Sequence, residues 1–263
     1  MIRLTVASLN TRGIPVVGSQ LSQRYAAIGA VFEASDADVV NFQEIASYYH
    51  LRRLVRSMPS YRAVSFHRGL AGPAGGLVTL SRVAVSGIAY RSFPRLPRAI
   101  AARLPRLSRV EAAFKGSLVT RLPGISIVNT HLTANPDGDW SETSRFYGLH
   151  QYELAALGRH IGSVEKPAVV SGDFNVARDS SLYCDIIGTT GLIDAFGDDC
   201  PPTFRAEYLG PGKSPHCIDY LLTDPSTTVE TAELIFTDPL PLAGGPTYAS
   251  DHLGLQARVT AAR

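Results

Sequence analysis

Short runs rich in β-branched residues recur along the whole chain, and each is bordered by polar residues that can do chemistry. The runs have the length and composition of buried strands. The polar groups beside them are Asn10, Gln43-Glu44, Asn129-Thr130-His131, Gly172-Asp173-Phe174-Asn175, Asp219 and Ser250-Asp251-His252. Strand ends at one rim of a sheet are where a rigid scaffold presents functional side chains. The pattern therefore predicts one polar site assembled from segments between residues 10 and 252.

The remaining apolar spacing predicts about ten strands and only three or four helices. Helices are expected over about 20–35, 50–57 and 143–163, with a short one from near Ser180. Many strands with few helices indicate two packed sheets flanked by helices. Because one site draws on both ends of the chain, we expect a single domain over residues 1–263.

Composition narrows the class of protein. The chain has 263 residues, 45% hydrophobic content and a net charge of +2, which demands neither a nucleic acid nor a membrane as partner. No run approaches 18 apolar residues, so no transmembrane segment is expected. Three cysteines without a CxxC pair and the absence of a visible signal peptide favour a reducing, cytoplasmic location. We expect a monomer.

The segment Arg91 to Arg109 differs from the rest of the chain. It contains six arginines, three prolines and no acidic residue, with apolar residues interleaved. Such a loop can lie on an anionic membrane surface or hold a phosphate backbone. A solvated insertion with scattered charge is the alternative interpretation.

The residue types in the polar groups favour a hard cation, because Mg²⁺ prefers oxygen ligands and usually takes one or two carboxylates. Glu44 is the strongest candidate ligand, and Asn10 offers a neutral oxygen to the metal or orients a phosphate. Histidines beside such an oxygen site are residues that metal-assisted attack on phosphorus can use. Taken singly, Glu44 would be a surface glutamate and Asn10 a buried, hydrogen-bonded amide.

Taken together and in this order, the motifs resemble the endonuclease/exonuclease/phosphatase superfamily, which includes deoxyribonuclease I, apurinic endonucleases, inositol polyphosphate 5-phosphatases and neutral sphingomyelinases. The resemblance runs from Asn10 to His252, and Gly-Asp-Phe-Asn and Ser-Asp-His are its more specific parts. It implies a four-layered α/β sandwich, a divalent cation (Mg²⁺, or Mn²⁺ in its place) at the rim, and hydrolysis of a phosphoester.

The resemblance also suggests roles for single residues. Asp173 orients or deprotonates the attacking water, and Asn175 donates to a phosphoryl oxygen. His252 is the expected general base, with Asp219 accepting from its other ring nitrogen. Asp251 completes the metal's surroundings, and His131 protonates the leaving oxygen or stabilises the transition state. Lys213 would place a positive charge on the phosphate, or is a solvated loop lysine.

The substrate is less constrained by the sequence. Asp219-Tyr220 replaces the Asp-Arg pair of inositol polyphosphate 5-phosphatases, and residues 72–75 lack the acid that deoxyribonuclease I supplies near this strand. The runs 75–82, 129–135 and 218–220 are similar to the neutral sphingomyelinase branch. We therefore favour a lipid-type phosphodiester over DNA or RNA. A phosphomonoesterase and a non-catalytic binding module are less favoured alternatives.

Overall fold

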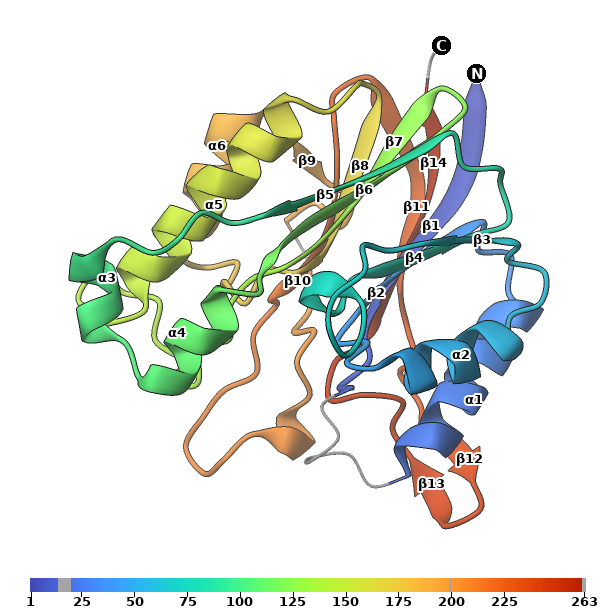
Figure 1. Ribbon diagram of the computed structural model, residues 1–263, viewed down its shortest axis with the longest axis horizontal. Coiled ribbons are helices and arrows are strands. Elements are labelled where there is room, and N and C mark those ends of the chain that lie inside the picture. Colours follow the sequence, from blue (N-terminus) through green and yellow to red (C-terminus); the bar gives the residue numbers. More distant parts are fainter. Residues whose placement is uncertain (14–19, 199, 262–263) are drawn as a thin grey trace.

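Two six-stranded sheets face each other in the computed structural model, which describes residues 1–13, 20–198 and 200–261 (Figure 1). The first sheet has the order β11 (Thr227–Ile235), β14 (Gly254–Ala261), β1 (Ile2–Asn10), β2 (Val39–Gln43), β4 (Val78–Ser81) and β3 (Ala63–Ser65). The second has the order β5 (Gly87–Ser92), β6 (Gly116–Leu122), β7 (Ile125–His131), β8 (Ala168–Asp173), β10 (Asp219–Thr223) and β9 (Ile193–Asp194).

Helices cover the outer face of each sheet. α1 (Leu21–Ala34) and α2 (Tyr48–Arg56) pack on the first sheet, where Ile28 and Phe32 join Phe42 in one core cluster. α5 (Tyr147–Gly162) and α6 (Ser181–Thr190) pack on the second, where Leu157 contacts the cluster that holds Val170. A third apolar cluster lies between the sheets. This arrangement confirms the predicted four-layered α/β sandwich.

The strand register carries the polar residues to one rim. In the second sheet, His131 and Asp219 are both register partners of Asp173. In the first sheet, Asn10 is the register partner of Gln43, directly before Glu44. Because β1, β2, β7 and β8 end here while the antiparallel β10 begins here, residues far apart in sequence meet at the same edge.

Buried amides hold the two sheets in alignment. Gln43 Nε2 donates to Asn129 Oδ1 at 2.8 Å, and Asn129 Nδ2 donates to the carbonyl oxygens of Phe42 and Val78. These side chains are fully buried. A buried polar group left without a partner is costly, so these bonds favour one relative position of the two sheets.

The segment Arg91–Arg109, predicted as a loop, is largely structured, and this prediction was wrong. It begins in β5 and continues into two short helices, α3 (Arg98–Arg103) and α4 (Arg106–Ala112). Pro97 and Pro105 stand directly before the two helices, where a fixed φ and a missing N–H are tolerated. Leu104 and Ala112 anchor them against α5, in a cluster with Phe146 and Leu149.

Several smaller elements were also not predicted. These are β5, β9, the hairpin of β12 (Leu240–Leu242) and β13 (Gly245–Thr247), and the 3₁₀ turns η1 (Ala74–Gly76) and η2 (Ala206–Tyr208). Ser180 does occupy the position before α6, but its side chain makes no capping bond there. Among the described helices, none is long and apolar enough to cross a membrane.

Candidate active site

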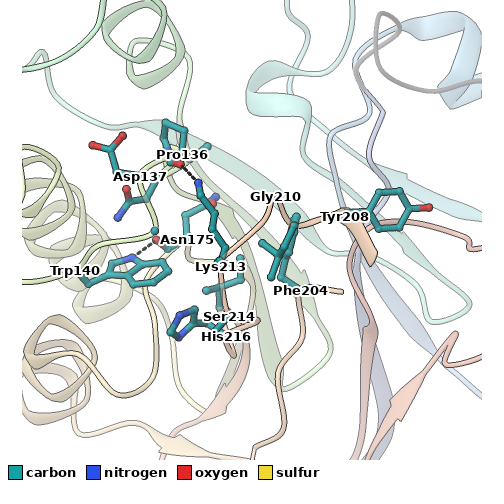
Figure 2. Close-up of a pocket in the computed structure, with 16 residues that line it drawn as sticks. Pro136, Asp137, Trp140, Asn175, Phe204, Tyr208, Gly210, Lys213, Ser214 and His216 are labelled. Atoms are coloured by element: carbon teal, nitrogen blue, oxygen red, sulfur yellow. Dashed lines mark hydrogen bonds between the residues drawn. The ribbon is translucent and has the colours of Figure 1, made fainter. Parts of the chain in front are cut away.

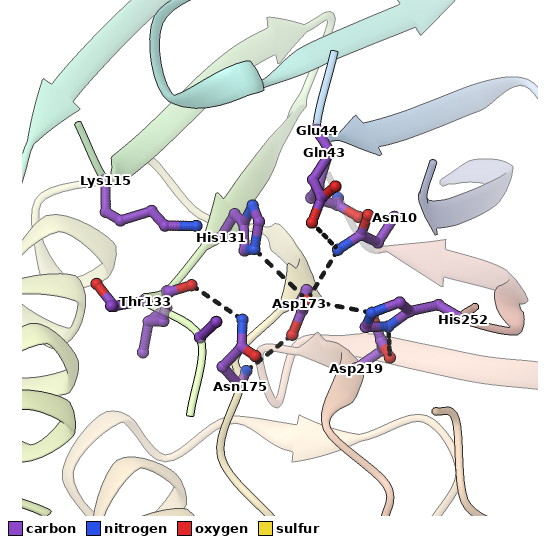
Figure 3. Close-up of polar contacts among 12 residues, drawn as sticks. Asn10, Gln43, Glu44, Lys115, His131, Thr133, Asp173, Asn175, Asp219 and His252 are labelled. Atoms are coloured by element: carbon purple, nitrogen blue, oxygen red, sulfur yellow. Dashed lines mark hydrogen bonds and ion pairs between the residues drawn. The ribbon is translucent and has the colours of Figure 1, made fainter. Parts of the chain in front are cut away.

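The amide of Asn10 joins the two sheets at the rim (Figure 3). Its Nδ2 donates to Glu44 Oε1 at 3.2 Å and to Asp173 Oδ2 at 2.9 Å. Its Oδ1 accepts from the backbone N–H of Arg12 at 3.0 Å. Glu44 and Asp173 are therefore separated by a single side chain, although they are 129 positions apart in the sequence. The predicted role of Asn10 as an oxygen ligand would require its amide to turn over.

His252 and Asp219 form a buried pair beside this amide. The Nδ1 atom of His252 lies 2.9 Å from Asp219 Oδ2, so this nitrogen carries a hydrogen that the carboxylate accepts. The hydroxyl of Thr203 donates to the same carboxylate oxygen at 2.6 Å, and the ring of Phe204 packs edge-on against the imidazole. The Nε2 atom is thereby turned toward Asp173, whose Oδ2 lies 3.7 Å away.

His131 approaches Asp173 from the other side. Its Nε2 lies 3.5 Å from Asp173 Oδ2. The buried side chain of Lys115 extends toward His131 in Figure 3 and pairs with Glu111 Oε1 at 2.9 Å. A positive charge thus stands at the edge of the site next to a histidine that is expected to face the substrate.

Asp251 lies at the rim, where its carboxylate forms an ion pair with Arg12. Its Oδ2 lies 3.3 Å from Arg12 Nε, and its Oδ1 lies 3.9 Å from His252 Nε2. The guanidinium of Arg12 also stacks on the ring of Tyr208 at 4.4 Å from the ring centre. The carboxylate therefore has an ion-pair partner on one oxygen, and its other oxygen accepts from the hydroxyl of Ser250 at 3.1 Å.

Asn175 and Lys213 belong to the wall of an adjoining cavity (Figure 2). The Asn175 backbone N–H donates to Asp173 Oδ1 at 2.8 Å, while its Nδ2 donates to the carbonyl of Leu132 at 3.0 Å. Lys213 Nζ donates to the carbonyl of Pro136 at 2.6 Å. Lys213 therefore lies in the cavity wall, and its expected contact with a phosphate stays a prediction.

The cavity has a volume of about 610 Å³ and meets the polar cluster at Asn175 and Phe204. Its wall includes the aromatic side chains of Trp140, Tyr208 and His216. Trp140 Nε1 donates to the carbonyl of Asn175 at 2.8 Å, which links the position of the wall to the position of the site. A substituent of the reacting group can thus be accommodated next to the cluster.

Three site residues adopt left-handed backbone conformations that residues other than glycine rarely adopt. These are Arg12 (φ 48°), Glu44 (φ 62°) and Asn175 (φ 50°). Such conformations cost on the order of 1–3 kcal/mol each and persist only when the surroundings impose them. Their concentration at this rim supports its identification as the functional centre.

The two histidines have opposite charge preferences. Burial lowers the pKa of His131 well below its ordinary value, and the charges of Lys115 and His252 lower this pKa further. Burial also acts to lower the pKa of His252, but the carboxylates of Asp219 and Asp173 outweigh it and raise this pKa. Burial and the neighbouring charge of Asp219 raise the pKa of Asp173. His131 is therefore neutral, while the His252–Asp173 pair retains a proton.

The donor set at the rim suits a divalent cation. Oxygen atoms of Asp173 and Asp219 and a nitrogen of His252 lie within 4.8 Å of one another, and the carboxylates of Glu44 and Asp251 lie beside them. Four carboxylates outnumber the nearby cations Arg12, Lys115 and His252. Hard cations of the Mg²⁺ type prefer such oxygens, and a bound cation would offset the repulsion among them.

Some contributors to the site carried no recognisable sequence signal. Lys115, Arg12 and Thr203 act through contacts that only the folded chain provides. Arg24 is another, because its buried guanidinium donates to the carbonyls of Thr11, Arg12 and Ala249 and so ties α1 to the site loops. An acid-free run of arginines ahead of Lys115 is the one pattern that could have drawn attention to this side of the site.

Comparison with known protein families identifies one that matches the chain. The sequence profile of the Endonuclease/Exonuclease/phosphatase family matches residues 7–252. Among curated protein sequences, none matches the chain.

Solved structures share the fold at low sequence identity. A crystal structure of beta toxin from Staphylococcus aureus has a TM-score of 0.75 at 17% identity, covering 97% of this chain and 99% of that one. D. rerio TDP2 complexed with single strand DNA product has a TM-score of 0.74 at 17% identity, covering 98% and 99%. Sphingomyelinase C from Streptomyces griseocarneus has a TM-score of 0.71 at 17% identity, also covering 98% and 99%.

Proposed function

The chain belongs to the endonuclease/exonuclease/phosphatase family, and on this basis we propose that it is a Mg²⁺-dependent phosphodiesterase acting by in-line attack of water. The observation that carries the proposal is the meeting of Glu44, Asp173, Asp219 and His252 at one rim, with Asn10 bonded to two of the carboxylates. These residues come from both sheets and from both ends of the chain. The preferred substrate is a lipid-type phosphodiester.

A cation at the rim would be held by Glu44, with Asp251 beside it and Asn10 as a further candidate. A bound Mg²⁺ or Mn²⁺ acts as a Lewis acid on phosphoryl oxygens. A related crystal structure supports Mg²⁺ as the cation, since beta toxin from Staphylococcus aureus with the F277A, P278A mutations is described with bound magnesium ions.

The protein's own residues would handle the proton of the attacking water. Asp219 fixes the His252 ring so that Nε2 faces Asp173. In the free site, His252 and Asp173 share a proton. A cation bound nearby would favour release of that proton to solvent, which would leave the pair able to accept one from the attacking water. His252 is thus proposed to act as a base together with Asp173, which combines the roles that the resemblance suggests for the two residues.

Donors around the cluster would stabilise charge that develops on phosphorus-bound oxygens. Asn10 and Asn175 provide amide N–H groups, and neutral His131 can donate from Nε2. Lys115 adds a positive charge behind His131. Because the pKa of His131 is lowered, we propose that it stabilises the transition state by a hydrogen bond rather than by giving up a proton at neutral pH.

The adjoining cavity supports a substrate with a compact substituent on its phosphate. Ligand pockets of several hundred Å³ lined by aromatic side chains typically enclose small groups, and the cavity here has about 610 Å³. A lipid headgroup fits that description. A nuclease acting on a single strand is the second candidate, favoured by the likeness to TDP2 in complex with single strand DNA product.

The proposal can be tested by parallel assays on bis-p-nitrophenyl phosphate, sphingomyelin vesicles and plasmid DNA, each with EDTA and with added Mg²⁺. We expect hydrolysis to stop on chelation and to return with Mg²⁺ or Mn²⁺. His252→Ala and Glu44→Gln should each reduce turnover by about 100-fold or more, while the exposed Glu142→Gln should retain it. Near-native turnover of His252→Ala, or turnover that persists in EDTA, would reject the mechanism. Activity confined to plasmid would select the nuclease.

A further inference from the structure

The outer face of α4 exposes apolar side chains to solvent. Leu107, Val110 and Phe114 are exposed by 83%, 52% and 66%. Leu107 and Val110 lie three positions apart on one side of the helix, whereas Ser108 and Ala112 are buried on the other side. The helix is therefore anchored by small residues while it presents large apolar ones outward. Exposed apolar patches of this kind commonly mark interaction sites.

Unpaired positive charge surrounds these side chains. Arg95, Arg98, Arg106 and Arg109 are exposed, and their side chains make no hydrogen bond or ion pair with any residue the structure describes. The one acid in α4, Glu111, is engaged by Lys115. Guanidinium groups without an acidic neighbour complement an anionic partner.

This face lies next to the candidate active site. The chain passes from α4 through Phe114 directly to Lys115, whose side chain extends toward His131 (Figures 1 and 3). On the loop between β3 and η1, Leu70 is fully exposed and Arg68 is exposed as well. Gly75, shortly after that loop, packs close to the carbonyl of Phe114. Apolar side chains and arginines from two segments thus stand beside the same rim.

We propose that this α4 surface, formed by Leu107, Val110 and Phe114 with Arg106 and Arg109, docks the protein on an anionic membrane. Apolar side chains of an interfacial helix enter the boundary between headgroups and acyl chains, while basic side chains pair with lipid phosphates. A nucleic acid would use the arginines but would offer no apolar medium to Leu107 and Val110. The proposal deepens the proposed function by naming how a lipid substrate is reached, although docking itself requires no catalysis.

Vesicle flotation tests the docking directly. Wild-type protein should float with phosphatidylcholine vesicles that contain phosphatidylserine and should float much less with phosphatidylcholine alone. Replacing Arg106 and Arg109 together by serine should weaken binding roughly 30-fold, at about 1 kcal/mol per arginine. Replacing Leu107 and Val110 together by serine should weaken binding at least about tenfold. Arg62→Ser and Ile193→Ser, at exposed positions elsewhere, are the matched controls.

Hydrolysis of soluble bis-p-nitrophenyl phosphate should be unchanged in all these variants, which separates docking from chemistry and from misfolding. The docking proposal is overturned if the wild type does not bind anionic vesicles, or if the controls lose as much binding as the α4 variants. It is also overturned if the arginine variant loses affinity for single-stranded DNA but not for vesicles. A wild type that floats yet hydrolyses no phosphodiester would support docking and reject the proposed function.

Discussion

His131 and His252 both lie within 4 Å of the Asp173 carboxylate, yet their surroundings give them different charge states. The difference comes from the groups on the far side of each ring. Burial lowers the pKa of both rings, but the Asp219 carboxylate beside His252 raises that pKa, whereas the ammonium of Lys115 near His131 lowers the His131 pKa further. Two histidines at one carboxylate can thus serve as proton acceptor and neutral donor.

This assignment predicts that Lys115→Met raises the pKa of His131, because one of the charges that oppose the imidazolium is removed. The pKa should stay below the ordinary histidine value, since burial is the larger cause. A histidine NMR titration of both proteins in EDTA measures the change. Lys166→Met, an exposed lysine that precedes β8 at the end of the strand away from Asp173, is the control. An unchanged His131 titration in Lys115→Met would show that the ammonium does not reach the ring.

At the level of elements, the close packing of β7 against β8 depends on Gly172. Its φ is 148°, and a Cβ atom there would lie 1.9 Å from the carbonyl oxygen of Thr130. We expect Gly172→Ala to lower the free energy of unfolding by about 2 kcal/mol or more and to displace Asp173. Gly188→Ala, in α6 where a Cβ meets no atom within 4 Å, should instead add up to about 1 kcal/mol.

Urea denaturation of the two glycine variants provides the comparison. Equal stability of Gly172→Ala and the wild type would mean that the backbone can relax around Thr130 without cost. In that case the account of how β7 and β8 place His131 opposite Asp173 would fail.

The elements also differ in how well the sequence could predict them. Strands such as β1 and β8 were predictable because apolar runs stop at chemically distinctive residues, Asn10 and Asp173. Helices α3 and α4 were not, because they are short and the large apolar residues of α4, Leu107 and Val110, face solvent. In the site, residues within motifs were identified in advance, whereas Lys115 contributes only through the turn that α4 imposes.

At the level of the whole molecule, a buried histidine on α5 makes stability depend on pH. His150 donates from Nε2 to the carbonyl of Thr133 at 2.9 Å, and burial lowers its pKa to about 4. The unfolded chain takes up the proton more readily, so stability is present above pH 6.5 and is lost as the pH falls toward 4. From pH 7 to pH 5 this histidine should cost about 2 kcal/mol.

His150→Gln keeps a donor for Thr133 but cannot titrate, so its stability should fall less between pH 7 and pH 5, by about the same 2 kcal/mol. Urea denaturation at both pH values gives the four free energies required. Parallel losses in the two proteins would show that His150 is not the group responsible.

The central claim is that side chains from both ends of the chain meet around one cation that also faces a phosphate. A crystal grown with Mn²⁺ and inorganic phosphate tests this most directly, because anomalous scattering locates the metal independently of the protein coordinates. We expect a peak bonded to a carboxylate oxygen of Glu44, with the phosphate between it and the Asp173–His252 pair. A metal bound elsewhere with this rim empty at saturating Mn²⁺, or Glu44 turned away from Asp173, would contradict the claim.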